Sequence, residues 1–143
     1  MTTVVDSNVI VALWDQEDNL SAIAQAGLDA ALDRGRLVIP APVFSELMAL
    51  PGRTETFLDR FFQSTGVTVD WNLDEQVWRA AGRAFQGYVG RRRKHPGPGP
   101  RRILADFLIG AYAASHNFAL LTLDEGLYLA GFPQLKIIRP RSS

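Results

Sequence analysis

Four acidic residues at the margins of apolar segments are the first candidates for chemistry: Asp6, Glu46, Asp106 and Asp124. A single acid in such a place often only caps a helix, since a carboxylate accepts backbone hydrogen bonds and favours the helix dipole. A cluster is different, because two carboxylates about 5 Å apart repel by on the order of 3 kcal/mol at an effective dielectric near ~20. A cluster therefore calls for a cation, and oxygen ligands suit Mg²⁺ or Mn²⁺ better than zinc.

Two polar residues, Asn8 and Thr122, each stand two positions from one of these acids. They can orient metal ligands or water from outside the cluster. A helix-capping Asn and an ordinary strand Thr explain them equally well. A hard cation held in such a site would polarise a phosphodiester oxygen and lower the pKa of a bound water.

The elements that must position these residues follow from the apolar pattern. Short β-branched or apolar runs predict strands at 2–6, 37–39, 66–69, 119–124 and 135–138. One-sided apolar spacing predicts helices at 7–14 (capped by Ser7 or Asn8), 19–35, 42–47, 54–62, 72–88 (with Asn72 and Glu75 as a capping signal) and 103–117. This alternation predicts an α/β fold, a three-layer α/β/α sandwich with a central, mostly parallel sheet.

Parallel strands bring the four acids to one edge. Asp6 and Asp124 end predicted strands, whereas Glu46 and Asp106 lie in the first turns of helices. Ligands of open parallel sheets collect beyond the carboxyl ends of the strands, where these positions meet. The sequence therefore predicts one shared site for all four carboxylates.

Charge is divided along the chain, although the formal net charge is +0. Residues 1–90 contain 6 basic and 12 acidic residues, whereas residues 91–143 contain 9 and 3. The Gly- and Pro-rich composition after Tyr88 predicts an exposed basic loop at 90–100. Basic side chains just before the Asp106 helix could hold phosphates, with an ordinary solvated surface as the alternative: Arg91, Arg92, Arg93, Lys94, Arg101 and Arg102.

Length and composition limit the remaining possibilities. A chain of 143 residues that is 47% hydrophobic predicts a single domain spanning 1–143. With no cysteine, disulfides, thiol nucleophiles and thiolate zinc sites are excluded. No apolar run approaches the roughly 20 residues that span a bilayer. The first fourteen residues lack the basic start of an export signal, so we expect a cytoplasmic protein.

Four segments in this order resemble the PIN-domain family, and most closely its VapC-type toxins. They are VVDSNVIVAL, VIPAPVFSELMAL, ILADFLIGAYAASHNFALLTLDEGLY and FPQLKIIRP, which together cover nearly the whole chain. The resemblance implies that Asp6, Glu46, Asp106 and Asp124 are the metal-binding acids, with Ser7, Asn8 and Thr122 as nearby polar positions. Ser7 replaces the more usual Thr of the first motif, and the last motif departs further, so that Glu125 is an alternative to Asp124.

Activity and partners also follow from the resemblance. Members of this family cleave RNA with Mg²⁺ or Mn²⁺, and VapC-type toxins inhibit translation by cutting tRNA, rRNA or mRNA. Toxins of this type form homodimers and are silenced by a VapB-type antitoxin.

Two other functions remain open on the sequence alone. An aspartyl-phosphate phosphotransfer domain could use Asp6 or Asp70 as nucleophile, but it would leave Glu46 and Asp106 without a role. A non-catalytic module could use the basic loop to bind RNA or a protein partner. The presence of all four acids argues against this last possibility.

Overall fold

The computed structural model describes residues 1–15, 19–94 and 104–141. Its centre is a five-stranded sheet in the order β3-β2-β1-β4-β5, and all the described strand pairs are parallel. The strands are β1 (Thr2–Val5), β2 (Arg36–Pro40), β3 (Thr68–Asp70), β4 (Ala119–Leu121) and β5 (Ile137–Ile138). The predicted α/β fold with a parallel sheet is confirmed.

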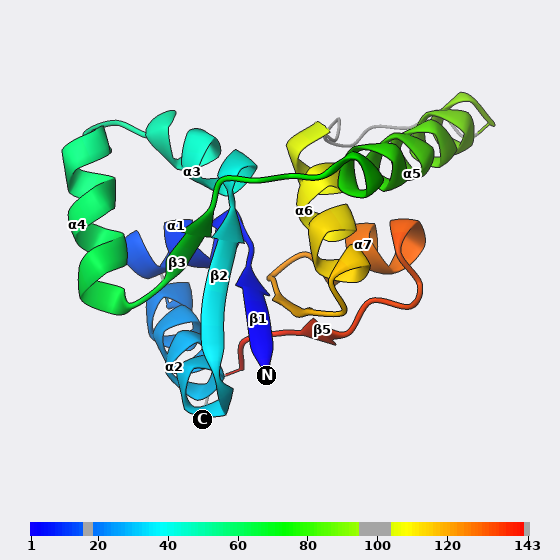
Figure 1. Cartoon of the computed structure of the whole chain (residues 1–143). Helices are drawn as coiled ribbons and strands as arrows, with labels where there is room; N and C mark the ends of the chain where they lie inside the picture. Colours follow the sequence, from blue (N-terminus) through cyan, green and yellow to red (C-terminus); the bar gives the residue numbers. More distant parts are fainter. Residues whose placement is uncertain (16–18, 95–103, 142–143) are drawn as a thin grey trace.

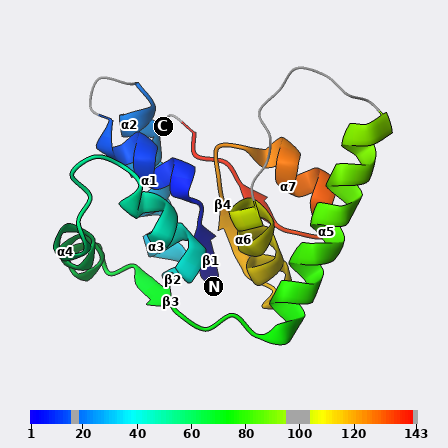
Figure 2. The same ribbon diagram turned by 90° about the horizontal axis from the view of Figure 1, so that it is seen from above.

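Seven helices in the described residues surround this sheet: α1 (Ser7–Trp14), α2 (Leu20–Arg34), α3 (Ala41–Met48), α4 (Glu55–Thr65), α5 (Glu75–Lys94), α6 (Leu104–Ser115) and α7 (Glu125–Gly131). Helices α1, α2 and α4 lie on one side of the sheet, and α5, α6 and α7 lie on the other (Figures 1 and 2). The chain passes from β1 to β2 and β3, then crosses back to β4. Right-handed crossovers therefore place the helices of the two halves on opposite faces.

The core is formed where the central strands pair. Val4 pairs with Val38 on one side and with Leu120 on the other, and all three side chains are buried. Strands covered on both faces favour such continuous apolar runs over alternating ones. Among the described helices, none is both long and apolar enough to span a membrane.

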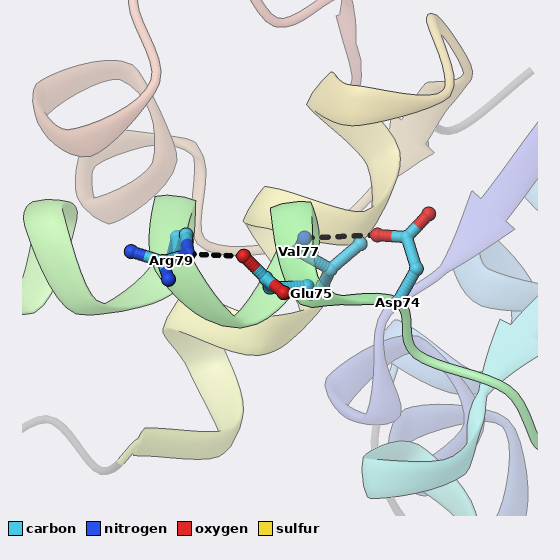
Figure 3. Close-up of polar contacts among 4 residues, drawn as sticks. All are labelled: Asp74, Glu75, Val77 and Arg79. Atoms are coloured by element: carbon cyan, nitrogen blue, oxygen red, sulfur yellow. Dashed lines mark hydrogen bonds and ion pairs between the residues drawn. The ribbon is translucent and has the colours of Figure 1, made fainter.

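Helix α5 differs from its predicted bounds at both ends. Asp74, rather than Asn72, caps its start: the Val77 backbone N–H donates to Asp74 Oδ1 at 3.1 Å. Figure 3 shows this bond beside the Arg79–Glu75 ion pair, 2.6 Å from Nε to Oε2. Asn72 lies two residues before this cap, and its backbone N–H donates to Asp70 Oδ1 at 3.0 Å.

The C-terminal end of α5 shows that the predicted basic loop begins too early. The helix continues through 90–94, where a loop was expected from Gly90 onward. Arg and Lys are good helix formers, and cations in a last turn interact favourably with the helix dipole. The rest of the predicted loop, with Arg101 and Arg102, lies outside the described residues.

The apolar spacing of the sequence did not predict helix α7. As a result, Asp124 has a different structural position from the one expected. The predicted strand 119–124 ends at Leu121, and Asp124 occupies the N-cap position of α7 instead of closing a strand. Helix α7 has only 7 residues and contains two glycines, Gly126 and Gly131. So short a segment shows little helical periodicity.

Helices α6 and α7 pack closely through Gly110. An ideal Cβ at this position would lie 2.4 Å from a Phe132 ring atom and 3.0 Å from Tyr128 Cδ1. Only glycine therefore allows α6 to approach the two aromatic rings this closely. The contact ties the helix that carries Asp106 to the helix that carries Tyr128.

Candidate active site

Asp6 lies at the topological switch point of the sheet. It follows β1, the strand from which the chain departs toward β2 on one side and to which β4 is added on the other. Its backbone N–H donates to the Leu121 carbonyl at 3.0 Å, continuing the β1–β4 pairing up to the site. Its side chain is only 2% exposed. In open α/β sheets, ligands bind beyond the carboxyl ends of the strands at such a switch point.

Two buried hydroxyl groups donate to the same oxygen of Asp6. Thr122 Oγ1 and the Tyr128 OH each lie 2.8 Å from Asp6 Oδ2. Burial is the largest influence on the Asp6 pKa and raises it, while these hydrogen bonds and those from Ser7 lower it; the net effect is a raised pKa. The carboxylate is thus held in one orientation inside an apolar surrounding that opposes its charge.

Asn8 orders the hydroxyl of Thr122. Its Nδ2 donates to Thr122 Oγ1 at 3.3 Å, and its Oδ1 accepts the Leu123 N–H at 3.2 Å. The Asp124 N–H also donates to Thr122 Oγ1, at 3.0 Å. With two donors on its oxygen, the Thr122 hydroxyl directs its own proton to Asp6.

Ser7 connects the first acid to the second. Its Oγ lies 3.4 Å from Asp6 Oδ1 and 3.2 Å from Glu46 Oε1. The sequence suggested Ser7 or Asn8 as the cap of α1, but the N-cap position is occupied by Asp6. Both side chains are instead engaged in contacts within the site.

Glu46 and Asp106 complete the electrostatic cluster from opposite helices. Glu46 is half-buried on α3, and its pKa rises to about 7 through burial first, then through the charges of Asp106 and Asp6. Burial and the same three carboxylates raise the pKa of Tyr128 far above its ordinary value. Tyr128 therefore remains a protonated donor, and Asp6, Glu46 and Asp106 share one field. Figure 2 shows the elements concerned, α1, α3 and α6, grouped around β1.

Asp124 lies at the start of α7, next to the Thr122 hydroxyl. The charges that act on Glu46 come from Asp106 and Asp6, and Asp124 is linked to the network through its backbone N–H on Thr122. Its place at the start of α7 is beside the switch point but on the β4 side. The structure thus places Asp6 and Asp106 close enough to Glu46 for their charges to raise its pKa.

The donor set fits a hard divalent cation. In the described part of the chain, no three Asp, Glu, His or Cys side chains already form a ready-made metal-binding group. Neither Asp6 nor Glu46 forms an ion pair with a described basic residue. The oxygens gathered here are carboxylate and hydroxyl, the donor types that Mg²⁺ and Mn²⁺ prefer.

The described basic residues of the predicted RNA-binding set lie at the end of α5. Arg91, Arg92, Arg93 and Lys94 form the last turn of α5, and the charged neighbours that perturb Glu46 are both acidic. Arg91 folds back along its own helix, where Nη1 lies 3.4 Å from an ideal Cβ on Gly87. Sequence reasoning placed these side chains near the site, and the described contacts leave that placement without support.

Tyr128 is the site residue that the sequence did not reveal. Its ring is 1% exposed and its hydroxyl reaches the Asp6 carboxylate from α7. A buried Tyr hydroxyl generally has a hydrogen-bond partner, and Tyr128 lies six residues after Thr122. That signal was available, but only once α7 is known to fold back over the strand ends.

The family to which this site belongs is defined by a match over most of the chain. The model of the PIN-domain family matches residues 3–133. The chain belongs to the PIN-domain family, whose domains are nucleases, hydrolases that act on nucleic acid. No curated protein matches the sequence.

Solved structures share the fold at low sequence identity. A chain of VapBC2 from Rickettsia felis, bound to a DNA fragment from its promoter, is 16% identical with a TM-score of 0.67, covering 97% of this chain and 98% of its own. A chain of FitAcB from Neisseria gonorrhoeae is 21% identical with a TM-score of 0.64, covering 96% and 97%. A chain of VapBC-1 from nontypeable Haemophilus influenzae is 19% identical with a TM-score of 0.62, covering 97% and 98%.

Proposed function

We propose that this chain is a metal-dependent endoribonuclease whose ligands for Mg²⁺ or Mn²⁺ are Asp6, Glu46, Asp106 and Asp124. One observation carries the proposal: at the switch point of a parallel sheet, burial and the carboxylates of Asp106 and Asp6 raise the pKa of Glu46 to about 7. A bound cation would stabilise the ionised form of carboxylates that repel one another. When bound, the cation would polarise the scissile phosphodiester and make its water more acidic.

The chain's own residues would prepare the site for this chemistry. Thr122, ordered by Asn8, and Tyr128 hold the Asp6 carboxylate. Ser7 sets the spacing between Asp6 and Glu46. Glu46, with a pKa of about 7, can take up or release a proton near neutral pH. Burial of Asp6 keeps water from competing for its oxygens.

The substrate and partners are proposed from the likeness to toxin–antitoxin complexes. We infer that the chain is the toxin of such a pair, cleaves tRNA, rRNA or mRNA in the cytoplasm, and forms a homodimer inhibited by a VapB-type antitoxin. The structurally similar chains come from VapBC and FitAB complexes, including three bound to DNA. The basic side chains 91–94, Arg101 and Arg102 would hold RNA phosphates.

The nuclease proposal is tested with purified protein and RNA. Cleavage should require Mg²⁺ or Mn²⁺ and stop with EDTA. Asp6→Asn and Asp106→Asn should reduce the rate by about 100-fold or more, because even groups that only support metal ligands are worth 10–100-fold. Far-UV circular dichroism must show that both variants remain folded. Sequencing RNA ends after expression of the intact chain beside Asp6→Asn would name the substrate.

Asp70→Asn is the matched control and also tests the phosphotransfer alternative. Both oxygens of Asp70 are engaged in local structure: Oδ1 accepts the Asn72 N–H at 3.0 Å and Oδ2 accepts the Tyr112 hydroxyl at 2.7 Å. Cleavage should therefore survive in Asp70→Asn. Undiminished cleavage in the Asp6 and Asp106 variants would remove the nuclease mechanism, whereas phosphate trapped on the protein and lost in Asp70→Asn would favour phosphotransfer.

The partner proposal has its own test. Binding the product of an adjacent antitoxin gene should stop RNA cleavage by the purified chain. Full cleavage in the bound complex would contradict the toxin–antitoxin assignment while leaving the nuclease intact.

A further inference from the structure

The two hydroxyls on Asp6 converge on one oxygen and leave the other nearly free of side-chain donors. Oδ2 accepts from both Thr122 and Tyr128 at 2.8 Å. Oδ1 has Ser7 Oγ at 3.4 Å as its side-chain neighbour, and the Ser7 backbone also donates to the carboxylate. A carboxylate oxygen offers two lone-pair directions, so two short hydrogen bonds occupy Oδ2. The carboxylate is divided into a structural oxygen and a ligand oxygen.

Divalent cations differ in how they use a carboxylate. Ca²⁺ takes 6–8 oxygen ligands at about 2.3–2.6 Å and often binds both oxygens of one carboxylate. Mg²⁺ requires a near-ideal octahedron at about 2.0–2.1 Å and takes one oxygen from each carboxylate. An Asp6 whose Oδ2 is already occupied can serve the second mode but not the first.

We propose that Tyr128 is a positioning residue that confines Asp6 to one-oxygen ligation and thereby selects Mg²⁺ or Mn²⁺ over Ca²⁺. The inference rests on the proposed metal-dependent function and assigns a residue that the sequence did not single out. Tyr128 acts through Asp6 alone, because a side chain that is 1% exposed cannot reach a substrate. Its ring is held against α6 at Gly110, so its hydroxyl is aimed by packing.

Removing the Tyr128 hydroxyl should disturb the fold less than removing the Thr122 hydroxyl. The Thr122 oxygen also accepts bonds from Asn8 and from the Asp124 backbone, so its removal disturbs β4 and the start of α7 together. The only hydrogen bond described for the Tyr128 hydroxyl is the one to Asp6. Tyr128→Phe removes that bond while keeping the buried ring.

The test measures cation affinity without relying on cleavage. Mn²⁺ binding to the full chain is followed by titration calorimetry and by the electron paramagnetic resonance signal of free Mn²⁺, with Mg²⁺ and Ca²⁺ as competitors. Tyr128→Phe should weaken Mn²⁺ and Mg²⁺ binding by about 10-fold, as loss of a ligand's hydrogen-bond partner does. The Ca²⁺-to-Mg²⁺ affinity ratio should rise, by about 10-fold as well, since Oδ2 keeps only the Thr122 hydrogen bond and one of its lone pairs becomes free to bind.

Tyr112→Phe is the matched control. It deletes another Tyr hydroxyl that donates to an aspartate, Asp70 Oδ2 at 2.7 Å, at the end of β3. Its cation affinities should equal those of the unaltered chain. If Tyr128→Phe does not fold, Thr122→Val, which removes the other donor to Oδ2, should shift the Ca²⁺-to-Mg²⁺ ratio in the same direction.

The outcomes separate this inference from the function on which it rests. If the unaltered chain binds no Mn²⁺, or if Asp6→Asn binds it equally well, the proposed metal site fails. If binding is normal and depends on Asp6, an unchanged Ca²⁺-to-Mg²⁺ ratio in folded Tyr128→Phe overturns the role of Tyr128 alone. A ratio that changes equally in Tyr112→Phe would overturn it as well.

Discussion

At the scale of single residues, the site is a place where charge is disfavoured. Glu46 has a pKa of about 7 instead of its ordinary 4.5, because burial, Asp106 and Asp6 all oppose its ionised form. The pKa of Asp6 is also raised, chiefly by burial. At a pH between the unfolded and native pKa values, and without a cation, these carboxyl groups are therefore protonated in the native protein but ionised in the unfolded chain.

This predicts an unusual pH dependence for the metal-free protein. A carboxyl whose pKa is higher in the native state contributes its full stability below the unfolded pKa, and that contribution is lost as pH rises. With EDTA present, the contribution of Glu46 to the free energy of unfolding should decline between pH 4.5 and about 7. The measurement is urea unfolding at a series of pH values.

Glu46→Gln is the comparison for this experiment. It removes the titrating group, so the difference in unfolding free energy between the two proteins should change across that interval and level off above it. A difference that stays constant from pH 4 to pH 8 would contradict a raised Glu46 pKa.

At the scale of elements, the sequence predicted the helices and strands that have a regular apolar spacing. It missed features that depend on contacts with neighbouring residues. Strand β1 and helix α1 were foreseen because their apolar residues follow a regular spacing, and Thr54 was found where α4 begins. Helix α7 was missed because seven residues with two glycines carry too little pattern. The true α5 cap, Asp74, was missed because Asn72 and Asp74 are both good capping residues, and spacing alone does not show which of them accepts the Val77 N–H.

The joint between α6 and α7 yields a prediction at this scale. Gly110→Ala places a methyl group against the Phe132 ring and Tyr128, so it should lower the free energy of unfolding by about 1–3 kcal/mol, as overpacking does. Thermal and urea unfolding measure the change. Because the same methyl displaces Tyr128, cation binding should weaken as well.

Gly82→Ala serves as the control substitution. An ideal Cβ at this α5 position has nothing within 4 Å, so alanine should stabilise the protein by about 0.5–1 kcal/mol through helix propensity alone. If Gly110→Ala were as stabilising as Gly82→Ala, the close packing of α6 on α7 would be disproved.

At the scale of the whole molecule, the site is assembled from segments far apart in the sequence. The parallel sheet order brings β1 between β2 and β4, which was predictable only as a fold class. The convergence of acids on one sheet edge was predicted from the carboxyl-end rule. The electrostatic effect of Asp6 and Asp106 on Glu46 depends on helix packing, so the sequence could not show that it raises the Glu46 pKa to about 7.

Mg²⁺ should therefore stabilise the folded chain as a whole. A ligand that binds only the native state adds about 2.7 kcal/mol at 100 times its dissociation constant, which a thermal scan with and without millimolar Mg²⁺ detects. Asp6→Asn should lose most of this increase, and Asp70→Asn should retain it. Equal increases in all three proteins would mean that Mg²⁺ binds elsewhere.

The two hydroxyls that donate to Asp6 Oδ2 belong to residues 116 and 122 positions later in the chain. During translation, a nascent chain therefore carries its first acid long before either hydroxyl that holds it has been synthesised. Strand β1 likewise pairs on both sides only after β4 has been synthesised. The hydrogen-bonded cluster around Asp6 can therefore form only after β4 and α7 have been synthesised.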